Sequence, residues 1–206
     1  MIKARRQKLP LWFFTTYFRV LQKFLFRKVE FKMLNSVPEG PVLLIQNHFS
    51  WWDGYWSYYV SEKILRRNFH VMMLEEQLRK RMFLARTGAF SVNRNSNNLL
   101  ASMRYASGLL SDSKNVVTIY PQGAIQSHYQ NKIQFEKGAE ILLRLCSNPV
   151  NLVFAVARIS YGTPVRPKVT VFVKFIGNKQ IASGQLEEAF NDFYTQCTKE
   201  TIDSEF

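Results

Sequence analysis

The sequence predicts a single α/β domain in which helices flank a mixed, mostly parallel sheet, with an amphipathic membrane-interface helix at the N-terminus. Three observations lead to this prediction. Short apolar runs bounded by Pro, Gly and polar residues alternate with stretches of helical periodicity. The length of 206 residues suits one such domain with a short appendage. Hydrophobic residues make up 47% of the chain, which is enough for a sizeable core.

Residues 1–34 are expected to form a basic, aromatic region that lies at a membrane interface. Residues 1–33 hold nine Lys or Arg and one acid, Glu30, and Pro10 suits the first turn of a helix. An apolar stripe follows at helical spacing and consists of Leu11, Phe14, Phe18, Leu21 and Leu25. Aromatic residues mixed with cations are typical of helices that lie among lipid headgroups. The alternative is a helix that packs on its own domain while its basic face is solvated.

The formal net charge of +13 indicates an anionic partner. A phospholipid surface, a phosphorylated substrate and nucleic acid all meet that description. The cations concentrate in the N-terminal stretch among Phe and Trp, which favours lipid, so no nucleic-acid partner is expected. Cys146 and Cys197 are far apart and predict neither a disulfide framework nor a zinc site. No apolar run reaches the roughly 20 residues that a membrane-spanning helix needs.

Residues 35–206 are expected to form the α/β domain. A turn-rich linker at 35–41 leads into it. Apolar runs predict strands at Val42–Gln46, Phe69–Leu74, Asn115–Tyr120, Leu152–Ile159 and Val169–Ile176. Helices are expected over Trp52–Leu65, from Leu74 to about Phe83, around Leu99–Leu110, over Gly138–Cys146 and around Leu186–Cys197. This alternation favours a largely parallel or mixed sheet.

The stretch Asn47–Gly54 follows the first predicted strand and holds the strongest candidate for chemistry. His48 and Asp53 lie five positions apart, and Asp53 falls near the first turn of the next helix. The junction of a strand and a loop is where α/β proteins place reactive groups. Asp53 could accept a hydrogen bond from a ring nitrogen of His48 and so orient the imidazole, as an acid does beside a catalytic base. A structural histidine that caps a turn is the alternative.

Two further turns carry candidate binding residues. The alternation from Gly88 ends in Arg94, where a strand gives way to a helix and a guanidinium can grip a phosphate. A surface salt bridge is the alternative for this arginine. The second turn follows the strand that ends at Tyr120, and there Gly123 permits a tight bend and a close approach of the backbone to a ligand.

These segments together resemble the glycerolipid acyltransferase family, of the bacterial 1-acylglycerol-3-phosphate acyltransferase type. Residues 47–53 resemble its first block, a histidine and an aspartate separated by four residues. Residues 88–94 are similar to the second block, which ends in arginine. Residues 120–124, Tyr-Pro-Gln-Gly-Ala, resemble the third, which is usually Phe-Pro-Glu-Gly-Thr. Gly138 and the apolar run Val153–Val156 match later features of the family.

The resemblance implies transfer of a fatty acyl group from a thioester of coenzyme A or acyl carrier protein to a hydroxyl of a lysophospholipid or related lipid. It implies His48 as the general base and Asp53 as the residue that orients it. Arg94 would bind an acceptor phosphate. The other expected substrate-binding residues are Asn47, Ser50, Gln122 and Gly123, and backbone amides near Gly123 are candidate donors to an oxyanion. No cofactor or metal is expected, since the acyl thioester is a co-substrate.

The sequence departs from the family pattern at the third and fourth blocks. Gln122 replaces a glutamate, Ala124 a threonine, Ile125 a frequent arginine and Ala155 a proline. The acceptor could therefore also be a glycolipid, an amino-lipid or a pigment-like alcohol. A second alternative is that the protein is a catalytically impaired membrane-binding module. The expected location is the cytoplasmic face of a membrane, as a peripheral or monotopic protein on anionic phospholipid.

Overall fold

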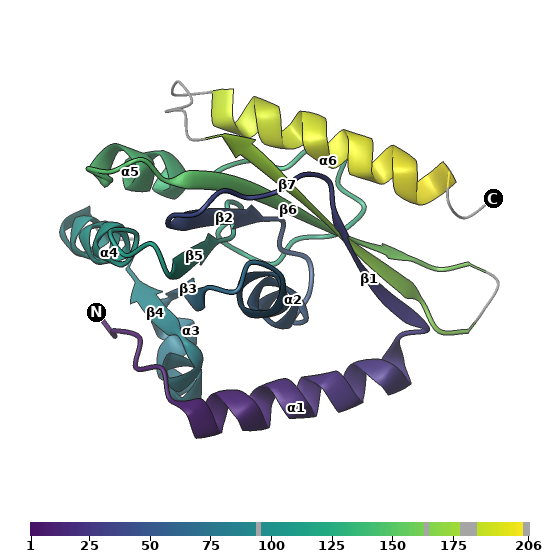
Figure 1. The fold of residues 1–206 in the computed structure, drawn as a ribbon, viewed down its shortest axis with the longest axis horizontal. Coiled ribbons are helices and arrows are strands. Elements are labelled where there is room, and N and C mark those ends of the chain that lie inside the picture. The colour runs from purple at the N-terminus through teal and green to yellow at the C-terminus, as the bar shows by residue number, and fades with distance from the viewer. Residues whose placement is uncertain (94–95, 163–164, 178–184, 204–206) are drawn as a thin grey trace.

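The computed structural model describes residues 1–93, 96–162, 165–177 and 185–203, with the backbone alone at 96–98. Seven strands form one sheet in the order β1-β7-β6-β2-β5-β3-β4 (Figure 1). The strands are β1 (Lys28–Met33), β2 (Val42–Gln46), β3 (Asn68–Leu74), β4 (Ala89–Val92), β5 (Asn115–Ile119), β6 (Asn151–Ser160) and β7 (Lys168–Gly177). The helices are α1 (Lys8–Leu25), α2 (Asp53–Tyr59), the π-helix η1 (Val60–Ile64), α3 (Glu75–Arg79), the 3-10 helix η2 (Met82–Thr87), α4 (Ser96–Leu109), α5 (Gly138–Leu145) and α6 (Gln185–Asp203).

The sheet is parallel over most of its width. β2 pairs in parallel with β5 and β6, and β3 pairs in parallel with β5 and β4. β7 runs antiparallel to β6, and β1 runs parallel to β7. The predicted class, an α/β domain with a mixed, mostly parallel sheet and an N-terminal helix, is confirmed. All five predicted strands are present with ends that agree within two residues.

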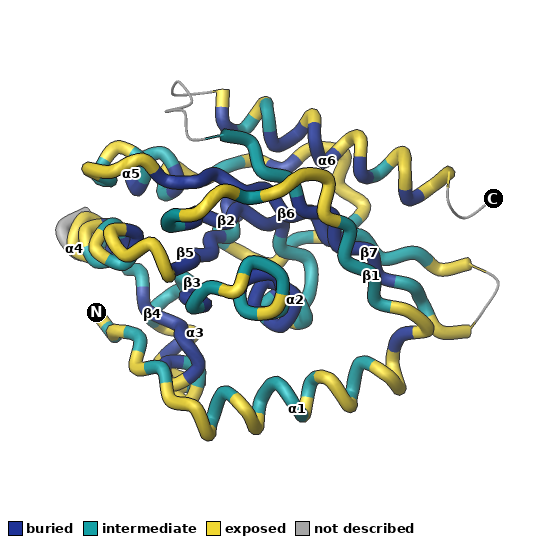
Figure 2. Tube along the Cα trace, viewed as in Figure 1, coloured by how far each residue is buried: buried dark blue, intermediate teal, exposed yellow. Residues whose placement is uncertain are grey.

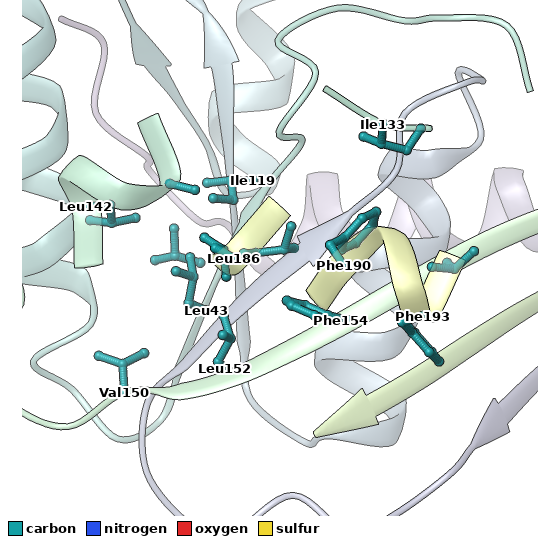
Figure 3. Packing of buried hydrophobic residues seen from close by; sticks show 14 of the residues in the cluster. Leu43, Ile119, Ile133, Leu142, Val150, Leu152, Phe154, Leu186, Phe190 and Phe193 are labelled. Atoms are coloured by element: carbon teal, nitrogen blue, oxygen red, sulfur yellow. The ribbon is translucent and has the colours of Figure 1, made fainter. Parts of the chain in front are cut away.

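The central strand β2 explains why its sequence is a continuous apolar run. All five of its residues are buried, because helices cover both faces of the sheet. Val42 and Leu44 join a core on the face of α2, while Leu43 and Ile45 join the core on the opposite face. Figure 3 shows that second core, in which Leu43 and Phe154 of the sheet meet Leu142 of α5 and Phe190 of α6.

The connections between strands reverse direction beside β2. The chain passes from β2 through α2 to β3 and skips β5, and it passes from β5 through α5 to β6 and skips β2. The two connections therefore leave neighbouring strands in opposite directions and on opposite faces. In open α/β sheets, the carboxyl ends of strands at such a reversal are where ligands bind.

The edge strand β1 is not anticipated by the sequence, which assigns residues 1–34 to the N-terminal helical region. Residues 28–33 instead pair with β7 along their whole length. Their alternation explains the strand, since Val29 and Phe31 pack on the core while Lys28 and Glu30 carry charge. Glu30 lies 3.4 Å from the Lys28 ammonium and 3.2 Å from that of Lys168 on β7. The N-terminal region thus contributes a strand to the sheet.

The helix α1 has two apolar faces, and the structure assigns them differently from the sequence. Most of the predicted stripe faces the domain, where Phe14 stacks on Phe83 at 4.8 Å between ring centroids and Phe18 stacks on Tyr55 at 5.4 Å. Leu25, the last residue of the stripe, is 46% exposed. The other face is exposed and consists of Leu9, Trp12, Phe13, Tyr17, Val20 and Phe24. In Figure 2 no part of α1 reaches the buried class. Periodicity located an apolar stripe, but only packing decides which stripe the domain covers.

No helix in the described part of the chain is both long enough and apolar enough to cross a membrane. The helix α1 spans 18 residues, but Lys8, Arg19 and Lys23 interrupt its apolar positions.

Gly88 links η2 to β4 in a conformation that a side chain cannot adopt without strain. Its φ is +118°, and a Cβ atom at this position would lie 2.4 Å from the main-chain oxygen of Phe69. The close approach lets β4 begin directly beside β3, where Val71 pairs with Ala89. Glycine is therefore required here by both backbone angle and space.

We expect Gly88→Ala to lower the free energy of unfolding by about 2 kcal/mol or more, because it adds both φ strain and a clash with rigid backbone. Gly108→Ala is the matched control, since a Cβ at Gly108 of α4 meets nothing within 4 Å. That variant is expected to gain about 0.5 to 1 kcal/mol from helix propensity. Urea denaturation measures both, and equal stabilities of the two variants would contradict the strain at Gly88.

Candidate active site

His48 lies just beyond the carboxyl end of β2, at the reversal between β2 and β5. The turn Pro121–Gly123 follows the carboxyl end of β5 on the neighbouring strand. Because the two strands are parallel, both loops emerge at the same edge of the sheet. The structure therefore brings residues 47–53 and 120–124 together at one edge of the sheet.

Asp53 is the acceptor around which the loop 47–53 is folded. It is the first residue of α2 and is fully buried. Its Oδ2 accepts hydrogen bonds from His48 Nδ1 at 2.8 Å, from the Phe49 amide at 2.8 Å and from the Ser50 amide at 2.7 Å. The spacing of four residues between His48 and Asp53 lets the chain turn tightly enough for one oxygen to collect all three groups.

The bond to Asp53 determines how the imidazole can react. A carboxylate oxygen accepts, so Nδ1 carries the proton and Nε2 keeps its lone pair. The His48 side chain is 20% exposed, whereas Asp53 is 0% exposed. The arrangement is therefore a partly accessible base whose orientation is fixed by a buried acid.

Two opposing effects act on the pKa of the buried Asp53 carboxyl. Desolvation has the largest effect and raises the pKa of Asp53, while the bonds from His48, Ser50 and Phe49 lower it. These donors stabilise the ionised form, and that form in turn stabilises an imidazolium on His48. When Nε2 takes up a proton, the positive charge of the imidazolium is therefore stabilised by the Asp53 carboxylate bonded to Nδ1.

Tyr120 is a site residue to which the sequence assigned no role. Its ring stacks on the His48 imidazole, with centroids 4.2 Å apart and 16° between planes. Its hydroxyl lies 2.9 Å from Ser57 Oγ, and Ser57 donates to the Asp53 carbonyl at 2.8 Å. Burial raises the pKa of Tyr120, so the hydroxyl stays protonated and donates to Ser57. The signal available in the sequence was the place of Tyr120 at the start of the Tyr-Pro-Gln-Gly turn.

Gln122 binds the main chain of His48 in both directions. Its Oε1 accepts from the His48 amide at 2.5 Å, and its Nε2 donates to the His48 carbonyl at 3.3 Å and to Gln126 Oε1 at 2.9 Å. The side chain is buried at 5% exposure. These contacts give Gln122 a positioning role at His48, and its contact with substrate stays a prediction from the sequence.

Asn47 also acts on the backbone. Its Nδ2 donates to the Ala157 carbonyl at 3.0 Å, and its Oδ1 accepts from the Ala157 amide at 2.8 Å. It is 2% exposed, so both of its polar atoms serve to hold the end of β2 against β6. Asn47 therefore links the end of β2 to β6, and its contact with substrate stays a prediction from the sequence.

Ser50 and Gly123 shape the two turns. Ser50 Oγ accepts from the Trp52 amide at 3.2 Å at the start of α2. Gly123 has a φ of +66°, and its own amide donates to the Tyr120 carbonyl at 3.1 Å. That amide closes the turn, so the Gly123 N–H is used within the loop and is a poor candidate for the oxyanion donor that the sequence suggested.

One predicted site residue lies outside this geometry. Arg94 falls outside the described residues, so its role as a phosphate ligand stays a prediction from the sequence. In the described part of the chain, no group of three or more His, Cys, Asp or Glu side chains could hold a metal ion.

Replacement of Gln122 by glutamate should destabilise the protein at neutral pH. A carboxylate cannot donate to the His48 carbonyl or to Gln126, and burial beside these oxygens raises its folded pKa. Stability relative to the wild type should be retained below the unfolded pKa of about 4.3 and lost as pH rises through the higher folded value. Thermal melts across pH 4 to 8 measure this. Gln77→Glu on the exposed face of α3 is the control, and a Gln122→Glu penalty that does not depend on pH would contradict the assignment.

Comparisons with known proteins bear on the family and the fold. The family model described as Acyltransferase matches residues 28–167. Among solved structures, the fold is similar to the 1-acyl-sn-glycerophosphate (LPA) acyltransferase PlsC from Thermotoga maritima, with a TM-score of 0.56 and 15% sequence identity. The similarity covers 93% of this chain and 79% of that one. A comparison with curated proteins finds no match.

The matched region begins at β1, contains the His48–Asp53 pair and the Pro121–Gly123 turn, and extends to the connection that precedes β7. It covers well over half of the chain. The protein therefore belongs to the acyltransferase family.

Proposed function

We propose that this protein transfers a fatty acyl group from a thioester of coenzyme A or acyl carrier protein to a hydroxyl of a lysophospholipid or related lipid. The observation that carries the proposal is the 2.8 Å bond between His48 Nδ1 and a fully buried Asp53 Oδ2. This bond leaves Nε2 as the basic atom at the carboxyl edge of the sheet. An alcohol needs such a base to become a nucleophile near neutral pH.

In the proposed reaction, His48 Nε2 takes the hydroxyl proton as the acceptor oxygen bonds to the thioester carbonyl carbon. The tetrahedral intermediate then collapses, the carbon–sulfur bond breaks, and the sulfur leaves as thiolate. The imidazolium returns its proton to that sulfur, which yields a thiol and an ester. The buried carboxyl of Asp53 stabilises the imidazolium between the two steps. No covalent intermediate on the enzyme is required.

Replacement of His48 by alanine should lower the rate of ester formation by about 100- to 10,000-fold, because the reaction loses its base. Asp53→Asn should have an effect of similar size, since a neutral amide carries no negative charge to stabilise the imidazolium. Thiol release from acyl-coenzyme A in the presence of a panel of lyso-lipids, followed by mass spectrometry of the product, measures both rates.

The matched control is Asp192→Asn on the exposed side of α6, which should retain wild-type turnover. An unchanged rate of ester formation in His48→Ala would contradict the role of His48 as general base. A wild-type protein that turns over no phosphate, sugar or amino-lipid acceptor would favour the alternative of a membrane-binding module that has lost activity.

The exposed face of α1 supports a membrane surface as the partner that supplies lipid substrates. Trp12 is 63% exposed, Phe13 61% and Phe24 70%, and Lys8, Arg19 and Lys23 are exposed on the same helix. Aromatic side chains that face solvent among cations suit the boundary between headgroups and acyl chains of anionic phospholipid. We place this surface against the cytoplasmic face of a membrane, with the protein bound peripherally or as a monotopic protein.

The double variant Trp12→Ser/Phe13→Ser should fold normally but bind vesicles of phosphatidylglycerol and phosphatidylcholine at least about tenfold more weakly, since it removes apolar area that the membrane would bury. Vesicle cosedimentation measures the binding. The control Leu100→Ser/Ile202→Ser alters two exposed apolar residues on α4 and α6, which lie across the sheet from α1 (Figure 1). Equal binding by both double variants would refute a role for this face.

A further inference from the structure

The segment 121–136 runs from the end of β5 past His48 without forming a helix or a strand. Its two ends are joined, because the Glu136 amide donates to the Pro121 carbonyl at 2.8 Å. Its first part is tied to the base, since the Gln126 amide donates to the His48 carbonyl at 2.9 Å. We call this segment the site loop. Because this segment forms no helix or strand, its backbone N–H and C=O groups need hydrogen-bond partners elsewhere in the protein.

The partners of the site loop come from one face of α6. Glu187 Oε2 accepts from the Phe135 amide at 3.0 Å. Asn191 binds Ile133 in both directions, accepting from its amide at 2.7 Å and donating to its carbonyl at 2.9 Å. The Tyr194 hydroxyl donates to the Gln130 carbonyl at 3.1 Å. Residues 187, 191 and 194 are spaced by four and three, so they share a helix face.

A fourth contact reaches the loop from the sheet. Arg158 of β6 donates from Nη1 to the His128 carbonyl at 3.0 Å and to the Tyr194 hydroxyl at 2.5 Å. Because the tyrosine oxygen accepts from Arg158, its own hydrogen is directed to the loop carbonyls. The His128 ring in turn lies 5.8 Å from the ring of Phe49, the residue after His48. The loop is thus held between α6 and the base.

The contacts between Asn191 and Ile133 are buried, and those of Glu187, Tyr194 and Arg158 are partly buried. Tyr194 is 1% exposed, Asn191 9% and Ile133 1%, and Figure 3 shows Ile133 beside Phe190 of α6. A buried polar group that loses its partner is costly, so each bond fixes the loop strongly. A helix that only completed the core would need just its apolar positions, Leu186, Phe190, Phe193 and Cys197. The polar face of α6 binds main-chain atoms of the loop instead.

We propose that Asn191, Tyr194 and Arg158 are positioning residues that hold the site loop in register with His48. The helix α6 lies beyond residues 28–167, the part matched by the family model, yet it supports the backbone on which the base depends. The proposal rests on the proposed function of His48 as base. Displacement of the loop changes the bonds to the His48 carbonyl and so the direction of Nε2 toward the acceptor hydroxyl.

The test compares Tyr194→Phe, which removes one hydroxyl and keeps the ring, with Tyr105→Phe. The Tyr105 hydroxyl accepts from the Ala4 amide at 3.2 Å, so the control loses a hydroxyl bonded to main chain outside the site loop. Asn191→Ala is a second variant. Hydrogen–deuterium exchange of peptides from 121–136 reports the loop, and steady-state kinetics with acyl-coenzyme A and the accepted lyso-lipid reports the reaction.

We expect Tyr194→Phe and Asn191→Ala to speed exchange in the site loop and to lower kcat by about tenfold, while the KM for the thioester stays within about twofold. Tyr105→Phe should change neither the exchange nor kcat. Faster exchange with unchanged kcat would overturn the positioning role, as would a lower kcat with wild-type exchange. If the wild type transfers no acyl group, the proposed function fails and the positioning role with it, while exchange still decides whether α6 holds the loop.

Discussion

The convergence of three N–H groups on Asp53 Oδ2 is the interaction on which the rest of the site depends. The carboxylate is buried at the start of α2, where it binds the imidazole and two successive amides. Burial raises the pKa of Asp53, and these donors compensate for the lost solvation of the charge. The same bonds fix the path of the loop after β2, so the carboxylate that orients the imidazole also folds the segment that carries it.

The surroundings of His48 act on its backbone as much as on its ring. Gln122 binds both the amide and the carbonyl of this residue, and Gln126 adds a second bond to the carbonyl. Tyr120 stacks on the ring, and Asn47, the residue before His48, binds Ala157 of β6. The segment after β5 thus contributes several restraints and β6 contributes one more, and together they fix the loop that carries His48.

Much of the fold and the core of the site could be predicted, because they follow local patterns. The five apolar runs and the five-residue step from His48 to Asp53 are visible in one dimension. The edge strand β1 was missed because its charged residues alternate within a region dominated by basic and aromatic side chains. The roles of Asn47 and Gln122 could not be read from the sequence, since each depends on a partner that lies more than 70 positions away.

The sequence by itself determined the α/β class, the family and the pair of residues that supports the proposed chemistry, because residue type and spacing carry that information. Tertiary structure alone decided which apolar face of α1 is covered, that Gln122 serves the backbone of His48, and that α6 binds the segment 121–136 through Asn191 and Tyr194. The physical reason is that burial and hydrogen-bond partnership are properties of contacts between distant segments. Periodicity can reveal that a face or a polar atom needs a partner, but only packing selects which one it finds.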